Sequence, residues 1–276
     1  MEFDFDRLGQ WSKNIWGMSQ QKSIEHLFKP IYHQAYVDKG EGAPVILLNG
    51  LFGNLKIWAP AVEALCKEYR VIVPRLPLFD SHMSMTSIKQ LVRVLHDFVE
   101  WHQLSGVTLV GHALGGQAAL FYANQHPEVI DKLVLVSSSG LLDKDITSDS
   151  GTISPFSFDF INDKVRTAFH QPDEAATGLA KEIYQFVQDA PKRLALTSLL
   201  QSSLHSSVST FLSKIDLPVL LIWGLQDQVN PPDNALHFHD LLPNSTVKFI
   251  DQCGHLPMLE KPDCFVETIG VFIKKK

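Results

Sequence analysis

Short apolar runs alternate with amphipathic segments along most of this chain, and that alternation restricts the fold more than any other feature. The runs are continuously apolar, which predicts strands buried on both faces of a sheet. The predicted strands are residues 45–49, 71–74, 107–110, 133–137, 219–223 and 247–250. The predicted helices are residues 59–68, 84–102, 114–125, 234–241 and 263–273. This order predicts an α/β fold with a mostly parallel sheet flanked by helices.

Residues 140–213 interrupt the alternation. The interval contains no convincing strand, and three helical stretches can be traced near residues 159–169, 173–188 and 191–203. Ligands of open α/β sheets bind beyond the carboxyl ends of the strands, so we expect this interval to form a helical cap there and to shape a substrate pocket. A helical insertion without a part in binding is the alternative.

The rest of the chain is divided by that cap. Residues 31–139 and 214–276 are predicted to form the α/β core. Residues 1–30 carry apolar side chains, including Trp11 and Trp16, at a spacing that suits one or two short amphipathic helices. We therefore expect an N-terminal helical extension that packs against the core, with a lid or partner-binding role as the alternative.

Charge and hydropathy restrict the partners. With 24 Lys and Arg against 30 Asp and Glu, the formal net charge is -6, which argues against nucleic-acid binding because phosphate contacts need clustered basic residues. No segment approaches the roughly 18 apolar residues of a membrane span, and the first ten residues lack the basic and apolar regions of a signal peptide. We expect a cytoplasmic protein with a small-molecule partner, while the sequence leaves the oligomeric state open.

The cysteines and two pairs of histidines form no metal-binding pattern. The three cysteines are spaced for neither a disulfide framework nor a zinc site, which indicates reduced thiols. Two pairs of histidines each share a predicted helix without a cysteine or carboxylate pattern for a metal; they are His96 with His102 and His237 with His239. We expect neither a metal nor a cofactor.

The segment VTLVGHALGGQAAL, residues 107–120, has the layout of a strand, a tight glycine turn and a helix. Its centre, GHALG, matches the pattern G-x-S-x-G except that Ala113 takes the place of the serine. Gly111 and Gly115 leave room for a turn that strains the backbone of the central residue. The segment therefore predicts a nucleophile elbow around a residue that has no nucleophilic atom.

The chain resembles the α/β-hydrolase superfamily from about residue 44 to the C-terminus, and the resemblance rests on this elbow and two later segments. Ala113 matches the nucleophile position of the family. LLIWGLQDQVNPP has an acid, Asp227, in the loop after a strand, and FIDQCGHLPMLEKP has His255 in the loop after the next one. The resemblance implies a capped serine hydrolase in which Asp227 orients His255 and His255 is the general base. Asp251 is a less favoured candidate for the acid.

The same resemblance implies an oxyanion hole. LLNGLFGN, residues 47–54, follows the first buried strand, and Asn49 stands where the family usually has a histidine. The backbone N–H groups of Leu51 and Leu114 would point at the developing oxyanion. Phe52 and Trp58 would line or support the substrate pocket, with packing in the core as the alternative.

Alanine at position 113 cannot form a covalent acyl intermediate, and three interpretations remain open. The chain is an engineered serine-to-alanine variant of an active hydrolase, a natural pseudo-enzyme that binds a ligand, or an enzyme that uses His255 and Asp227 for acid–base chemistry without a serine. The first is favoured because the elbow, the acid loop and the histidine loop are all retained.

Two substrate classes fit the resemblance. NGLFGNLKIW is similar to small intracellular acyl esterases, whereas VSSSGLL is compatible with capped relatives that cleave carbon–carbon bonds in diketones. The sequence predicts a modest ester or acyl compound as the substrate, and it does not separate an ester bond from a carbon–carbon bond.

Overall fold

The predicted parallel sheet is present in the computed structural model, which describes residues 36–51, 55–75, 79–80, 83–141 and 156–275. Its seven strands lie in the order β1-β3-β2-β6-β7-β8-β9, and β1 alone pairs antiparallel with its neighbour. The strands of this sheet are β1 (Tyr36–Lys39), β2 (Pro44–Leu48), β3 (Arg70–Pro74), β6 (Val107–His112), β7 (Ile130–Val136), β8 (Val219–Gly224) and β9 (Ser245–Ile250). Each of the predicted strands is found, which confirms the fold class.

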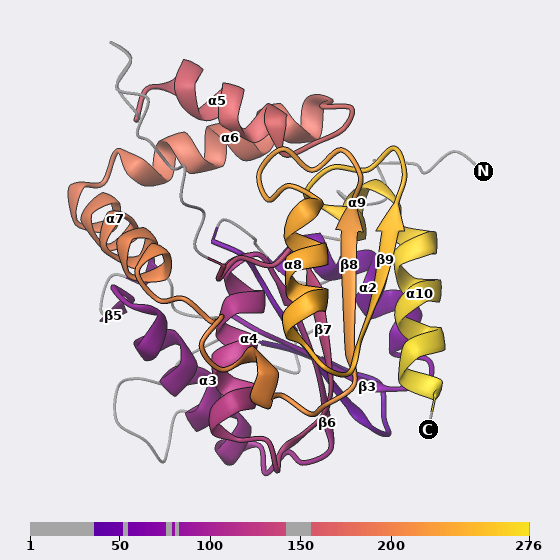
Figure 1. Cartoon of the computed structure of the whole chain (residues 1–276). Coiled ribbons are helices and arrows are strands. Elements are labelled where there is room, and N and C mark those ends of the chain that lie inside the picture. Colours follow the sequence, from indigo (N-terminus) through magenta and orange to yellow (C-terminus); the bar gives the residue numbers. More distant parts are fainter. Residues whose placement is uncertain (1–35, 52–54, 76–78, 81–82, 142–155, 276) are drawn as a thin grey trace. The chain divides into compact units, whose positions relative to one another are not determined.

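Helices cover both faces of this sheet (Figure 1). One apolar core lies between the sheet and α3 (Ile88–Trp101), α4 (Leu114–Gln125) and α8 (Asp233–Leu241). A second core lies on the opposite face, against α2 (Ala59–Leu65) and α10 (Pro262–Lys274). Successive residues of a strand point to opposite faces, so Leu109 of β6 belongs to the first core and Val110 to the second.

Short elements complete the described chain. They are the hairpin of β4 (Phe79–Asp80) and β5 (Met83–Ser84), the 3-10 helices η1 (Leu55–Trp58) and η2 (Leu212–Lys214), and α9 (Pro257–Glu260). The predicted helix at residues 84–102 starts too early, because residue 84 belongs to β5 and Ser87 is the cap of α3. The Ser87 side chain accepts a hydrogen bond from the backbone N–H of Gln90 at 3.3 Å, which satisfies one of the unpaired donors at the helix start.

The two edges of the sheet differ from the sequence prediction. β1 is short, and its YVDK sequence is half polar, so it lacked the apolar run that marks the inner strands. β9 was predicted to be buried on both faces, but its first five residues alternate between half-buried and exposed. This prediction was wrong: at this edge of the sheet, Val247 and Phe249 are only partly buried against one core, and the intervening Lys248 is exposed.

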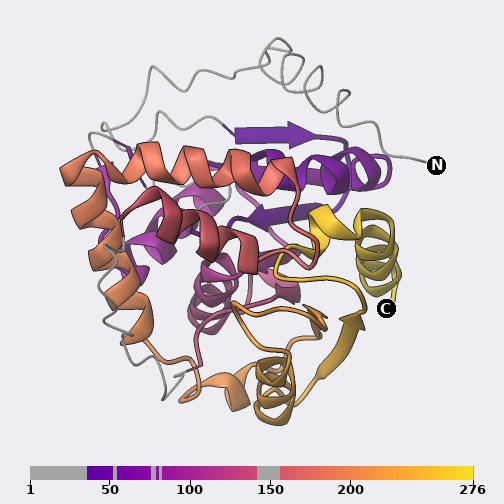
Figure 2. The ribbon, with the colours of Figure 1, turned by 90° about the horizontal axis from the view of Figure 1, so that it is seen from above.

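The described part of the interval between β7 and β8, where the sequence alternation breaks, contains three α-helices. They are α5 (Phe158–Thr167), α6 (Glu174–Val187) and α7 (Ala190–Leu204), and we call residues 156–214 the helical insertion. Figure 1 shows α5 and α6 beyond the arrowheads of β8 and β9, which mark the carboxyl ends of these strands, and Figure 2 shows the two helices side by side from that end. The predicted extension at residues 1–30 lies outside the described residues.

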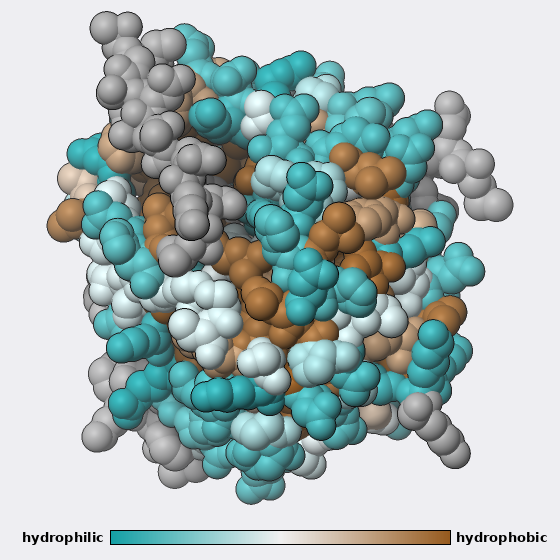
Figure 3. All heavy atoms as spheres, viewed as in Figure 1, coloured by the Kyte–Doolittle hydropathy of each residue, from teal (hydrophilic) through white to brown (hydrophobic). Residues whose placement is uncertain are grey.

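Polar side chains cover most of the face of the molecule that Figure 3 shows, and apolar side chains gather near its centre, beside α8. Leu225 and Val229, in the loop after β8, are each 44% exposed, and Leu236 of α8 is 46% exposed.

None of the helices in the described ranges is long and apolar enough to cross a membrane.

Candidate active site

Ala113 lies at a sharp turn between β6 and α4, as the nucleophile-elbow prediction requires. Its backbone has φ 49° and ψ -116°, a left-handed conformation that costs free energy for a residue with a side chain. The end of β7 holds this conformation, because the Ala113 N–H donates to the carbonyl of Val136 at 3.0 Å and the Ala113 carbonyl accepts from the N–H of Ser139 at 3.1 Å. Two backbone hydrogen bonds to β7 and the residues after it therefore help to hold the strained turn.

The glycines around Ala113 are required by close approaches between backbones. A Cβ atom on Gly111 would lie 2.5 Å from the carbonyl oxygen of Gly115, and one on Gly115 would lie 2.5 Å from that of Asn49. Both separations are far shorter than a van der Waals contact. The first α4 turn consequently packs directly against β6 and against the loop that follows β2.

Asp227 and His255 form a hydrogen-bonded pair at the carboxyl ends of β8 and β9. Nδ1 of His255 donates to Oδ2 of Asp227 at 2.9 Å, and both residues are buried. The other carboxylate oxygen accepts the backbone N–H groups of Val229 and Asn230, each at 2.9 Å. A carboxylate fixed in this way selects the tautomer with hydrogen on Nδ1 and leaves Nε2 of His255 able to accept a proton.

The environment of Asp227 favours its charged form. Burial alone would raise the pKa of the carboxyl group, but the hydrogen bond and charge of His255 and the backbone N–H of Asn230 outweigh burial and lower the pKa below its ordinary value. Asp227 is therefore an ionised acceptor at neutral pH.

Asp251, the other candidate acid, does not contact His255. Its carboxylate accepts from Nε2 of Gln226 at 3.0 Å and from the backbone N–H of Gln252 at 2.8 Å. Gln226 also accepts from the N–H of Cys253 at 2.9 Å, so Asp251 and Gln226 join the loop after β8 to the loop after β9. These hydrogen bonds fix the position of the loop after β8 relative to the loop after β9.

His112, which precedes Ala113, is a buried structural neighbour of His255. Its Nε2 donates to the carbonyl oxygen of His255 at 2.9 Å, and the two ring centroids lie 4.7 Å apart. Burial, followed by the nearby imidazole of His255, lowers the pKa of His112 to about 3. The ring is consequently neutral, and it links the elbow to the histidine loop.

Of the two expected oxyanion donors, Leu114 follows Ala113 in the chain, and Leu51 belongs to a loop that approaches it. A Cβ atom on Gly50 would lie 3.1 Å from that of Ala113, so the loop that contains Leu51 borders the elbow. Leu114 is the first residue of α4, and helix geometry leaves its N–H without a partner inside the helix. Asn49 is buried with Oδ1 unpaired within the described residues.

The two expected pocket residues have different outcomes. Phe52 lies outside the described residues. Trp58 is fully buried, and its ring packs against that of Phe265 in α10 with centroids 6.1 Å apart. The Trp58 position matches core packing, which was the alternative to lining the pocket.

Sequence reasoning missed Asn230, which connects the acid loop to the end of β7. Its Nδ2 donates to the Ser137 carbonyl at 2.7 Å, while its backbone N–H binds Asp227. Ser137 has φ 44°, and its N–H donates to Ile222 at 3.0 Å. The VSSSG segment was noted in the sequence, but nothing in it indicated that Asn230 would bind there.

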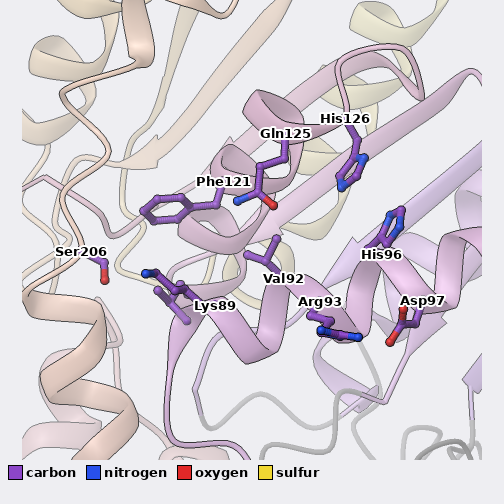
Figure 4. A pocket seen from close by; sticks show the side chains of 10 residues that line it. Lys89, Val92, Arg93, His96, Asp97, Phe121, Gln125, His126 and Ser206 are labelled. Atoms are coloured by element: carbon purple, nitrogen blue, oxygen red, sulfur yellow. The ribbon is translucent and has the colours of Figure 1, made fainter.

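Residues of α3 and α4 line a groove (Figure 4) with a volume of about 560 Å³, and neither Asp227 nor His255 is among its lining residues. Lys89, Arg93 and His96 of α3 contribute to it. His96 stacks on His126, with ring centroids 4.1 Å apart and an interplanar angle of 10°.

Across the described ranges, no group of three His, Cys, Asp or Glu side chains is arranged to hold a metal ion.

Known proteins resemble this chain over most of its length. The model of the alpha/beta hydrolase fold family matches residues 43–262. The 2-hydroxy-6-oxo-6-(2'-aminophenyl)hexa-2,4-dienoic acid hydrolase of Metapseudomonas resinovorans is 27% identical over 257 residues, which are 87% of each chain. The pimeloyl-(acyl-carrier protein) methyl ester esterase of Nitrosomonas europaea is 27% identical over 245 residues, which are 82% of this chain and 94% of that one.

A solved structure agrees with these relatives. MGS-MChE2, an alpha/beta hydrolase enzyme from the metagenome of sediments of the Mar Chica lagoon in Morocco, is 30% identical to this chain. The match has a TM-score of 0.70 and covers 87% of this chain and 94% of that one. With a family model that matches most of its residues and a sheet of the same kind, the chain belongs to the α/β-hydrolase family.

Proposed function

We propose that this site is the catalytic centre of a serine hydrolase that acts on a small ester or acyl compound, present here with alanine at the nucleophile position. The observation that carries the proposal is the buried 2.9 Å hydrogen bond between His255 and Asp227, next to the strained elbow at Ala113. A neutral imidazole oriented by a carboxylate is the arrangement that removes the proton of a serine hydroxyl.

With a serine at position 113, each residue has a defined role. Nε2 of His255 accepts the hydroxyl proton as the oxygen attacks the substrate carbonyl, and Asp227 stabilises the imidazolium that forms. The N–H groups of Leu51 and Leu114 stabilise the oxyanion of the tetrahedral intermediate. His255 then returns the proton to the leaving group, and water releases the acyl group in a second round of the same steps.

Alanine at position 113 removes the attacking oxygen and leaves the rest of the site in place. Acyl transfer from this residue is impossible, whereas the oxyanion donors and the pocket are retained. We propose that residues 140–213 are the cap that bounds this pocket, because α5 and α6 lie beyond the carboxyl ends of the strands and the carbonyl of Ala168 accepts the backbone N–H of His255 at 2.8 Å. The chain as it stands would bind substrate and lose most turnover.

Hydrolysis of a carbon–carbon bond is the second candidate function. The observation that favours it is the relative from Metapseudomonas resinovorans, whose name is that of a dienoic acid hydrolase. The esterase of Nitrosomonas europaea favours an ester. A third candidate is a ligand-binding protein without turnover, which the alanine itself favours.

Restoring the hydroxyl separates these candidates. The Ala113→Ser protein is expected to hydrolyse short-chain aryl esters, and adding His255→Ala should abolish that activity. A panel of esters, thioesters, lactones and vinylogous diketones then assigns the bond. Folded Ala113→Ser protein that turns over none of them contradicts the proposal and favours the binding role, which a ligand-dependent rise in melting temperature without product would support.

A further inference from the structure

A half-buried carboxylate that the proposed reaction does not use holds the loop that contains His255. Glu260 is the last residue of α9. Its Oε1 accepts the backbone N–H of Gly254 at 2.9 Å and that of Leu256 at 3.4 Å. These two residues are the neighbours of His255, so one side chain fixes the backbone on both sides of the imidazole.

The same carboxylate also binds the helical insertion. Its Oε2 accepts the backbone N–H of His170 at 2.8 Å, in the segment that follows α5. The backbone N–H of His255 itself donates to the carbonyl of Ala168 at 2.8 Å. The two backbones approach so closely that a Cβ atom on Gly254 would lie 2.6 Å from the Ala168 oxygen. Residues 168–170 and the His255 loop therefore behave as one joined unit.

The contacts between the helical insertion and the His255 loop require a carboxylate at position 260. Among the described residues it forms no ion pair with Lys or Arg, and its carboxylate accepts hydrogen bonds from three peptide N–H groups. Burial raises the pKa of its carboxyl group, and the three N–H donors counteract that rise. An ionised carboxylate accepts from all three donors, whereas an amide has one accepting oxygen and an NH₂ group that would face a peptide N–H.

We propose that Glu260 is a positioning residue for His255 and that it couples the orientation of the imidazole to the helical insertion. The inference rests on the proposed function, because it concerns the base of that reaction. A displacement of residues 168–170 moves the backbone of His255 through Glu260. The alignment of His255 Nε2 with position 113 therefore depends on the position of the helical insertion.

Glu260→Gln tests the proposal, because it keeps the size of the side chain and removes its charge. In the Ala113→Ser protein we expect Glu260→Gln to lower kcat roughly 10- to 100-fold, the effect of a displacement of a catalytic group by about 1 Å, with a smaller change in KM. Glu267→Gln is the matched control. Glu267 is exposed on α10, and its substitution should leave kcat unchanged.

Ser203→Ala distinguishes positioning of His255 from general loosening of the insertion. The Ser203 hydroxyl of α7 donates to the Gln117 side chain of α4 at 2.5 Å, a contact with the core that does not involve the histidine loop. If Ser203→Ala lowers kcat as much as Glu260→Gln does, the loss comes from a looser insertion, and the positioning role is overturned. A loss confined to Glu260→Gln supports the role.

A spectroscopic measurement decides the question in the Ala113 protein, without any activity. The Nδ1 proton of His255 is strongly deshielded in proton NMR when it is bonded to a carboxylate. We expect Glu260→Gln to shift or broaden this resonance, and Glu267→Gln and Ser203→Ala to preserve it. An unchanged resonance in folded Glu260→Gln protein overturns the proposal. An inert Ala113→Ser protein with the expected NMR result would contradict the proposed function and leave the positioning role intact.

Discussion

Nδ1 of His255 lies 2.9 Å from Oδ2 of Asp227, although 28 residues of sequence separate them. The distance is that of a strong charge-assisted hydrogen bond. Both side chains come from loops at the carboxyl ends of adjacent strands, β8 and β9. The register of the parallel sheet thus brings the two side chains together.

Removing the charge of Asp227 should cost activity through the tautomer of His255. In the Ala113→Ser protein, Asp227→Asn is expected to lower kcat by about 10⁴-fold, the loss seen when an amide leaves the base in the wrong tautomer. Asp240→Asn, at an exposed position of α8, is the control and should retain full activity. Steady-state kinetics on an aryl ester measures both, and a loss below about tenfold for Asp227→Asn would exclude the assigned role.

The lowered pKa of Asp227 makes a pH-dependent contribution to folding. A carboxyl group whose pKa is lower in the folded state stabilises that state above its unfolded pKa of about 4, and the contribution disappears as pH falls through the folded value. The unfolding free energy of the parent should therefore exceed that of Asp227→Asn at pH 7, with a difference that shrinks below about pH 4. Urea titrations at several pH values test this; a difference independent of pH contradicts it.

The His112 ring is expected to stay neutral throughout the physiological range. Burial lowers its pKa to about 3, and its Nε2 hydrogen is held by the His255 carbonyl. NMR of labelled histidine side chains between pH 5 and 8 should show no titration of this ring. Titration of His112 near pH 6.5, the ordinary value for histidine, would mean that its environment is less buried than described.

The elbow glycines should tolerate no side chain. Gly115→Ala introduces a Cβ atom 2.5 Å from the Asn49 carbonyl and 2.6 Å from that of Leu48, and overpacking of this kind typically destabilises by about 1–3 kcal/mol. Gly178→Ala is a sharp control, because its Cβ would meet no atom within 4 Å. That change in α6 should stabilise by roughly 0.5–1 kcal/mol. Thermal unfolding measures both, and equal effects at the two sites would contradict the close packing.

The elbow and the pair of loops were predictable because each is a short local pattern. Gly111 and Gly115 flank position 113 in one pentapeptide, and Asp227 and His255 each follow an apolar strand closely. The contacts of Glu260 were not predictable, because its partner His170 lies 90 residues away and offers a backbone N–H. A backbone donor has no sequence signature.

The role of Trp58 and the existence of β1 could not be predicted from the sequence either, because both depend on contacts between distant segments. A tryptophan such as Trp58 suits a pocket wall and a core equally well in sequence, and only the packing of Phe265 against it decides between them. β1 was not predicted because half of its YVDK sequence is polar. Its pairing with β3 is made by backbone groups, which leave no pattern in the sequence.

Covalent labelling tests the central claim most directly, because it reports whether this site activates a hydroxyl at position 113. A fluorophosphonate reacts with a serine whose proton is removed by a neighbouring base. Intact-mass spectrometry should show one added phosphonyl group on the Ala113→Ser protein, and none on the Ala113 parent or after further His255→Ala substitution. A folded Ala113→Ser protein that stays unlabelled, or one labelled equally well without His255, would contradict the account.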